Sequence, residues 1–184
     1  MSEWYAYREG GVELRFHTCT VAKWDGHAAY INGIQRLQGT KAVDFAVLAP
    51  DDLVALVELK DFRGHGTENR RRLRGGELAR EVAEKARDTL AGMTWACGRD
   101  HCTDDIGKIT SGFYRRDRDK ILVILWLDQD DLAKPAEASA LASTIRSCLQ
   151  PHIQAKVVVT SLRLFQGRLP ASISSWLEVR SLPR

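Results

Sequence analysis

The chain has 184 residues, of which 44% are hydrophobic and 28% charged, so residues 1–184 suit one folded domain with a buried core. No apolar run approaches the ~20 residues that cross a bilayer, and no basic start followed by an apolar stretch marks a secretion signal. We therefore expect a soluble, cytoplasmic protein without membrane contact. The formal net charge of +3 is too small to indicate a nucleic-acid partner by itself.

The N-terminal part favours short strands and one short helix. Residues 3–8 and 12–22 are rich in β-branched and aromatic residues and flank a pair of glycines, which predicts a hairpin or two short strands. Residues 26–38 can form a short helix, although Gly33 weakens it.

Two apolar strands follow in close succession. Residues 42–50 and 53–62 are separated by Pro50–Asp52, which is typical turn chemistry. So short a link predicts an antiparallel hairpin. Nearly every residue of the second strand before Glu58 is apolar, which is typical of a central strand covered on both faces.

The strongest helical pattern lies further along. Residues 63–76 are rich in glycine and arginine and predict a loop, and residues 77–91 then predict a helix that ends at Gly92. One face of that helix is apolar and the opposite face is acidic. The apolar positions are Leu78, Val82, Ala86 and Leu90, and the acidic ones are Glu77, Glu81, Glu84 and Asp88.

The C-terminal half completes the pattern of an α/β protein. After an irregular stretch, residues 120–129 predict a buried strand, residues 136–149 a helix and residues 155–165 a last strand. The order of strands, helix, strand, helix and strand predicts a mixed β-sheet with flanking helices.

Three charged residues of the predicted hairpin carry a possible site. Glu58 and Lys60 are two apart on one strand and project to the same face, and the antiparallel pairing brings Asp44 beside them. Burying such charges is costly unless they are paired or hold a metal. Two carboxylates aimed at one point suit Mg²⁺ or Mn²⁺, and a neighbouring lysine can hold a water and offset negative charge. The competing interpretation is an α/β interaction protein whose strand simply ends in solvent-exposed charges.

The segment from Asp44 to Lys60 resembles the signature of the PD-(D/E)XK nuclease superfamily, and the resemblance covers about residues 20–130. It implies a restriction-endonuclease-like fold, a mixed β-sheet flanked by helices. It also implies a metal held by Asp44, Glu58 and the Leu59 carbonyl, with Lys60 supporting the attacking water.

The sequence departs from that signature at one place and leaves one ligand open. Val43 stands where the signature has proline. Many members also carry an acid on a helix upstream of the first motif. Asp25 is the candidate for this further metal ligand, and Glu13 is the alternative.

Basic residues after the signature are candidates for binding nucleic acid. Glu81 and Lys85 are four apart on the predicted helix and share an edge, where ordinary solvated ion pairs are the alternative to a site. Lys85 borders the apolar stripe and is the helix residue we select. The other candidates could neutralise phosphates from the flexible loop, and they are Arg63, Arg70, Arg71, Arg72 and Arg74.

The cysteines give a weaker signal. Cys97 and Cys102 with His101 between them hint at zinc, but the spacing is wrong for a zinc knuckle and no second close pair exists. We expect ordinary reduced thiols.

Together these features predict a Mg²⁺- or Mn²⁺-dependent nuclease that hydrolyses phosphodiester bonds, with DNA expected in preference to RNA. A role in a multi-protein bacterial defence or DNA-processing system follows from the resemblance alone. The chain has little room for a separate specificity domain, so a partner protein or a homodimer is expected unless cutting is non-specific. The alternative is a catalytically silent subunit of the same fold that binds nucleic acid or a partner protein.

Overall fold

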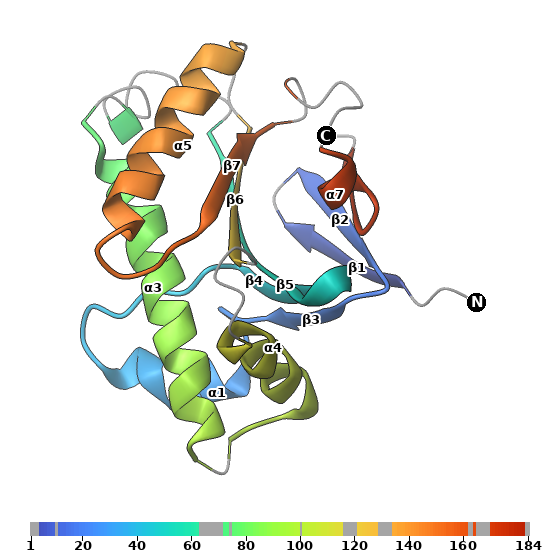
Figure 1. Ribbon diagram of the computed structural model, residues 1–184, viewed down its shortest axis with the longest axis vertical. Coiled ribbons are helices and arrows are strands. Elements are labelled where there is room, and N and C mark those ends of the chain that lie inside the picture. Colours follow the sequence, from blue (N-terminus) through green and yellow to red (C-terminus); the bar gives the residue numbers. More distant parts are fainter. Residues whose placement is uncertain are drawn as a thin grey trace.

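A computed structural model gives the structure of the chain, and the two sheets and the helices that it shows make a mixed α/β fold (Figure 1). No helix in the described part of the chain has both the length and the apolar character to cross a membrane. The structure describes residues 4–9, 11–62, 72–73, 75–99, 101–115, 121–128, 134–161, 164 and 170–182.

The strands form a small sheet and a larger one. The small sheet has the spatial order β1 (Trp4–Glu9), β2 (Val12–His17) and β8 (Leu177–Ser181). The larger sheet has the order β3 (Thr20–Lys23), β4 (Phe45–Ala49), β5 (Leu53–Asp61), β6 (Ile121–Asp128) and β7 (Lys156–Thr160). The helical elements are α1 (Ala28–Asn32), η1 (Ile34–Arg36), η2 (Pro50–Asp52), α3 (Glu77–Cys97), α4 (Asp104–Tyr114), α5 (Pro135–Leu149) and α7 (Ala171–Ser174).

The larger sheet is mixed, as the order of elements predicts. β4 pairs with β5 antiparallel, with Phe45 opposite Val57, and η2 links the two strands. The predicted hairpin is therefore confirmed. β5, β6 and β7 run parallel, because α3 and α4 connect the first pair and α5 connects the second.

β5 is the central strand and is covered on both faces, as predicted. Val54 and Leu56 pack in a core with the helices, whereas Ala55 and Val57 pack in a second core with the small sheet. Figure 1 shows α3 and α5 on one side of the larger sheet and the β1–β2 hairpin on the other. The molecule thus has three layers, and each face of β5 has its own neighbours.

The N-terminal predictions are right in kind and wrong in extent. The hairpin of β1 and β2 forms, but the predicted strand 12–22 breaks at Thr18, which has a φ of 54°, and continues as β3 in the other sheet. The predicted helix 26–38 is reduced to α1 and η1. The break falls at Gly33, where a Cβ would lie 2.3 Å from the Trp95 ring and 2.4 Å from a backbone oxygen.

The predicted end of the long helix at Gly92 is wrong, because α3 continues to Cys97. Gly92 is a point of close packing and not a stop. A Cβ there would lie 3.0 Å from Trp24 and 3.1 Å from Ile34. The missing side chain allows α3 to approach the segment around α1 closely.

Three elements in the C-terminal half, α4, α7 and β8, have no counterpart in the predictions. The stretch predicted to be irregular contains α4, which buries Ile106 and Ile109. The predicted strand 155–165 is shorter, since β7 ends at Thr160, and a later strand, β8, pairs with β2. The sequence pattern did not predict β8, because this strand is defined by its pairing with a distant part of the chain.

Candidate active site

The structure places Asp44, Glu58 and Lys60 on one face of the larger sheet. The side chains of Ala46, Val54 and Leu56 pack towards the helices, and alternation along each strand puts the three charged residues on that same face. Asp44 precedes β4 and lies one position beyond the last pair, Phe45 with Val57, so it stands across from Glu58.

Glu58 is a carboxylate without solvent contact, since its exposed fraction is 0%. This is not a strand end that reaches solvent. Its Oε1 lies 3.0 Å from Lys60 Nζ and 2.6 Å from Lys85 Nζ. Its Oε2 is buried and has no hydrogen-bond partner among the described residues. Oε1 of Glu58 therefore pairs with two ammonium groups, whereas Oε2 has no partner among the described residues.

Lys60 is held from two sides. Besides Glu58, its Nζ lies 2.9 Å from Glu81 Oε1 on α3, and Glu81 Oε2 lies 2.5 Å from Arg72 Nη2. Burial opposes the charge of Lys60, but Glu58 and Glu81 together hold its pKa above the ordinary value. Burial likewise opposes the charge of Glu81, yet Lys60 and Arg72 lower its pKa overall.

Asp44 is a buried carboxylate whose pKa is raised well above its ordinary value. Burial first, and then the negative charge of Glu58, raise the pKa of Asp44 to about 7. A hydrogen bond of 2.6 Å from the Leu59 backbone N–H to Oδ2 and the positive charge of Lys85 act in the opposite direction. The charges of Asp44 and Glu58 therefore interact directly, and a shared cation would relieve their repulsion.

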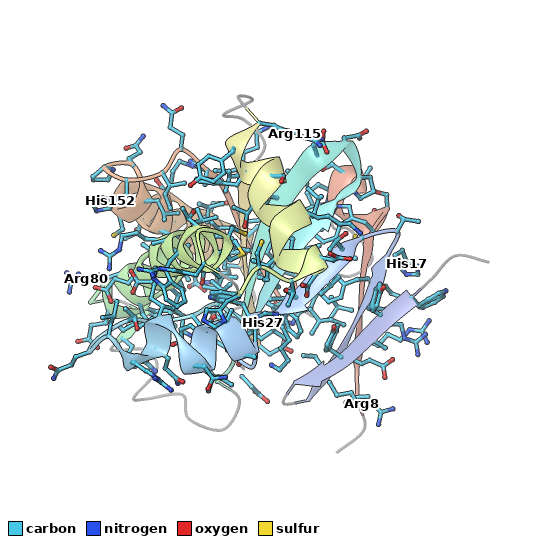
Figure 2. The ribbon with its side chains drawn as sticks, turned by 90° about the horizontal axis from the view of Figure 1, so that it is seen from below. Arg8, His17, His27, Arg80, Arg115 and His152 are labelled. Carbon is cyan, nitrogen blue, oxygen red and sulfur yellow. The ribbon has the colours of Figure 1, made fainter. Side chains whose placement is uncertain are left out.

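The two candidates for the upstream acid have different surroundings. Asp25 lies in the turn between β3 and α1, not on a helix, and its charge adds to those that raise the pKa of Asp44. Glu13 lies on β2, where Arg15 and Arg8 bind its carboxylate at 2.6 and 3.1 Å. Figure 2 shows Arg8 on the small sheet, at the opposite side of the molecule from Arg80 of α3. Asp25 is thus near the site, and Glu13 belongs to the outer sheet.

The residues predicted to grip nucleic acid are described only in part. Arg72 is described, and besides its contact with Glu81 it lies over the Phe62 ring, 5.5 Å from the centroid. Lys85 lies at the site itself through its contact with Glu58. The remaining predicted residues, Arg63, Arg70, Arg71 and Arg74, lie outside the described residues.

Sequence reasoning did not assign a role to Glu81. The structure makes it the second acceptor of Lys60 and joins it to Arg72. The signal was present, because Glu81 and Lys85 share a helix edge at a spacing of four. The spacing alone does not show that this edge of the helix faces the end of β5 and not solvent.

The donor set fits a divalent cation in a limited way. No group of three or more His, Cys, Asp or Glu side chains suited to a metal occurs among the described residues. Mg²⁺, however, is commonly bound by one or two protein carboxylates, with waters and substrate phosphates completing the shell. Such an ion would bind Glu58 through its unsatisfied Oε2 and Asp44 through its carboxylate, whose pKa is raised by burial and by the charge of Glu58.

The cysteine cluster lies apart from these residues. Cys97 at the end of α3 and Cys102 have their sulfur atoms 2.6 Å apart, and all four cysteines are free thiols. His101 stacks on Trp95 at a centroid distance of 5.7 Å. His101 is thus engaged by an aromatic ring.

Comparison of the chain with protein-family models, with curated proteins and with solved structures finds no match.

Proposed function

We propose that this protein is a metal-dependent nuclease that hydrolyses phosphodiester bonds of DNA, with a restriction-endonuclease-like arrangement around its central strand. The observation that carries the proposal is the meeting of buried Asp44 and Glu58 across the β4–β5 hairpin, with Lys60 on the same face. Two facing carboxylates and a lysine at the end of a buried strand are costly to fold, and a hydrolytic site gives them a use.

The residues have distinct roles in this proposal. Asp44 and Glu58, with the Leu59 carbonyl, would hold Mg²⁺ or Mn²⁺. The bound ion would polarise the phosphoryl group and lower the pKa of a water. Lys60 would hold the attacking water and offset the charge that develops on the phosphate. Glu81 would keep the Lys60 ammonium in place from the helix side, because it binds Nζ at 2.9 Å.

The same site also supports a second candidate, a silent subunit of this fold that binds nucleic acid or a partner protein. The observation that favours it is that Lys60 and Lys85 both form ion pairs with Glu58. Such a subunit would keep the ion pairs as structural elements. The two candidates differ in whether Asp44 and Glu58 take up a metal.

Cleavage assays with purified protein separate these candidates. Supercoiled plasmid, linear duplex, single-stranded DNA and single-stranded RNA are incubated with Mg²⁺ or Mn²⁺. We expect Lys60→Ala to lower the cleavage rate by about 10²-fold or more. Lys41→Met is the control. It removes a lysine that pairs with Glu84 of α3, away from Glu58, and should leave the rate unchanged.

The outcomes are distinct. Cleavage of RNA but not DNA would correct the substrate class. Equal rates for wild type and Lys60→Ala would indicate a contaminant and remove support for the site. Absence of cleavage together with absence of Mg²⁺ or Mn²⁺ binding in calorimetry would overturn the nuclease proposal in favour of the silent subunit.

A further inference from the structure

The feature with the furthest consequence is the position of Lys85 relative to both acids. Its ammonium lies 2.6 Å from Glu58 Oε1. It also acts on Asp44, because the positive charge of Lys85 lowers the pKa of that carboxyl. The ammonium of Lys85 on α3 therefore pairs with Glu58, and its charge also favours the ionised form of Asp44. A divalent ion bound between the two acids would have the same electrostatic effect.

Lys85 comes from a helix and Lys60 from the strand, so the two lysines are not equivalent. Lys60 has a second carboxylate partner in Glu81, at 2.9 Å, whereas Lys85 forms an ion pair only with Glu58 among the described residues. Lys85 is only 17% exposed, so its charge is weakly screened by solvent. Of the two lysines, Lys85 is therefore the one that relies on Glu58 as its ion-pair partner.

Lys85 also has an alternative partner within reach. Glu81 lies four residues earlier on α3, one turn away, where a lysine and a glutamate can pair along the helix. The positive charge of Lys85 already contributes to lowering the pKa of Glu81. If the ammonium of Lys85 left Glu58 for Glu81, it would join Lys60 and Arg72 at that carboxylate.

We infer that Lys85 is an internal counter-ion that competes with the divalent cation for Asp44 and Glu58 and thereby sets the metal affinity of the site. This inference rests on the proposed function. With no metal bound, Lys85 neutralises Glu58 and keeps the carboxylates together. When the ion binds, the ammonium of Lys85 must either move away or remain beside a second positive charge, which is unfavourable. The site therefore binds the metal more weakly than Asp44 and Glu58 alone would.

The inference is tested by Mn²⁺ titration calorimetry on the full chain after chelator treatment. Lys85→Met removes the competing charge, so we expect its Kd for Mn²⁺ to fall at least about tenfold below that of the wild type. Lys85→Arg keeps the charge and should stay within about threefold of the wild type. Lys41→Met, the matched loss of a lysine elsewhere beside α3, should also stay within about threefold.

Thermal unfolding gives a second measurement. Without metal, Lys85→Met should melt below the wild type because Glu58 loses a partner, and saturating Mn²⁺ should narrow this difference. If Lys85→Met does not fold without metal, Lys85→Gln replaces it, since its amide can still donate to Glu58 Oε1 but carries no charge.

Each result has one meaning. Tighter Mn²⁺ binding by the neutral variants, with Lys85→Arg and Lys41→Met unchanged, supports the inference. Wild-type binding of Mn²⁺ with equal or weaker binding by Lys85→Met and Lys85→Gln overturns it and leaves the nuclease proposal standing. Absence of Mn²⁺ binding in the wild type and in every variant overturns both.

Discussion

At the scale of single residues, the site is a chain of alternating charges. Lys85 binds Glu58, Glu58 binds Lys60, Lys60 binds Glu81, and Glu81 binds Arg72. Each of these five charges has a neighbour of opposite sign, which makes their burial tolerable. Because the links share partners, the loss of one residue should alter the contribution of the next.

This coupling predicts a non-additive response at Glu58. Glu58→Gln should lower the free energy of unfolding by about 1–3 kcal/mol, because two ammonium groups lose their buried carboxylate. Adding Lys85→Met removes one of those stranded charges, so the double variant should be less destabilised than the sum of the single variants. Urea unfolding of all four proteins measures the interaction energy. Strict additivity would show that Lys85 does not depend on Glu58.

Outside the site, Glu13 gives a prediction about pH. Hydrogen bonds from Arg15 and Arg8 lower the pKa of Glu13 from its ordinary value of 4.5. A carboxyl whose folded pKa is lowered stabilises the protein above its unfolded pKa, and the contribution is lost as the pH falls through the folded pKa. The difference in urea midpoint between wild type and Glu13→Gln should be constant from about pH 6 to 8 and shrink below about pH 4.5. A difference that persists at about pH 3 would assign the effect to packing and not to charge.

At the scale of elements, α3 matters most because it packs on the core and also supplies residues to the site. Its apolar face buries Leu78, Val82, Ala86 and Leu90, as the sequence pattern predicts. Its other edge presents Glu81 and Lys85 to the end of β5. The close approach at Gly92 fixes the C-terminal half of the helix against Trp24. The position of the helix therefore determines where two of the site's charges lie.

The close approach at Gly92 can be tested by adding volume. Gly92→Leu should lower the free energy of unfolding by about 1–3 kcal/mol, because its Cβ alone would lie 3.0 Å from Trp24 and 3.1 Å from Ile34. Gly98→Leu is the control, since a Cβ there would meet only backbone oxygens at 3.6 and 3.7 Å. Urea unfolding compares the two variants. Equal effects would show that Gly92 is not a packing constraint.

At the scale of the whole molecule, the second core joins the two ends of the chain. β8 pairs with β2, the His17 N–H donates to the Trp176 carbonyl, and the Leu182 N–H donates to the Gly11 carbonyl. Trp176 is buried between the sheets, and its indole N–H donates to the Ser172 carbonyl at 2.7 Å. The layer opposite the helices is therefore closed only when the C-terminal strand is in place.

A pair of tryptophan variants tests how much this closure contributes. Trp176→Ala should lower the free energy of unfolding by about 3–5 kcal/mol, the usual effect of removing a large buried side chain. Trp95→Ala removes a ring that is 37% exposed and should cost less than half as much. Thermal or urea unfolding measures both. A loss of about 0.5 kcal/mol or less for Trp176→Ala, the usual size for a surface substitution, would mean that the second core contributes little to stability.

The sequence by itself determined the features that depend on local pattern. The β4–β5 hairpin follows from two apolar runs around a turn, the apolar face of α3 follows from its periodicity, and the common face of Glu58 and Lys60 follows from strand alternation. The opposition of Asp44 and Glu58 follows from the same hairpin. These are short-range consequences of backbone geometry.

Only the tertiary structure decided what depends on contacts between distant segments. The addition of β8 to the small sheet arises from pairing across the chain, and the continuation of α3 past Gly92 depends on how closely it packs against Trp24. The roles of Glu81 and Lys85 were decided in the same way. A spacing of four places both on one helix edge, but only the packing of α3 against β5 turns that edge towards Glu58 and Lys60. Local sequence fixes which residues share a face, and burial of the core fixes what that face meets.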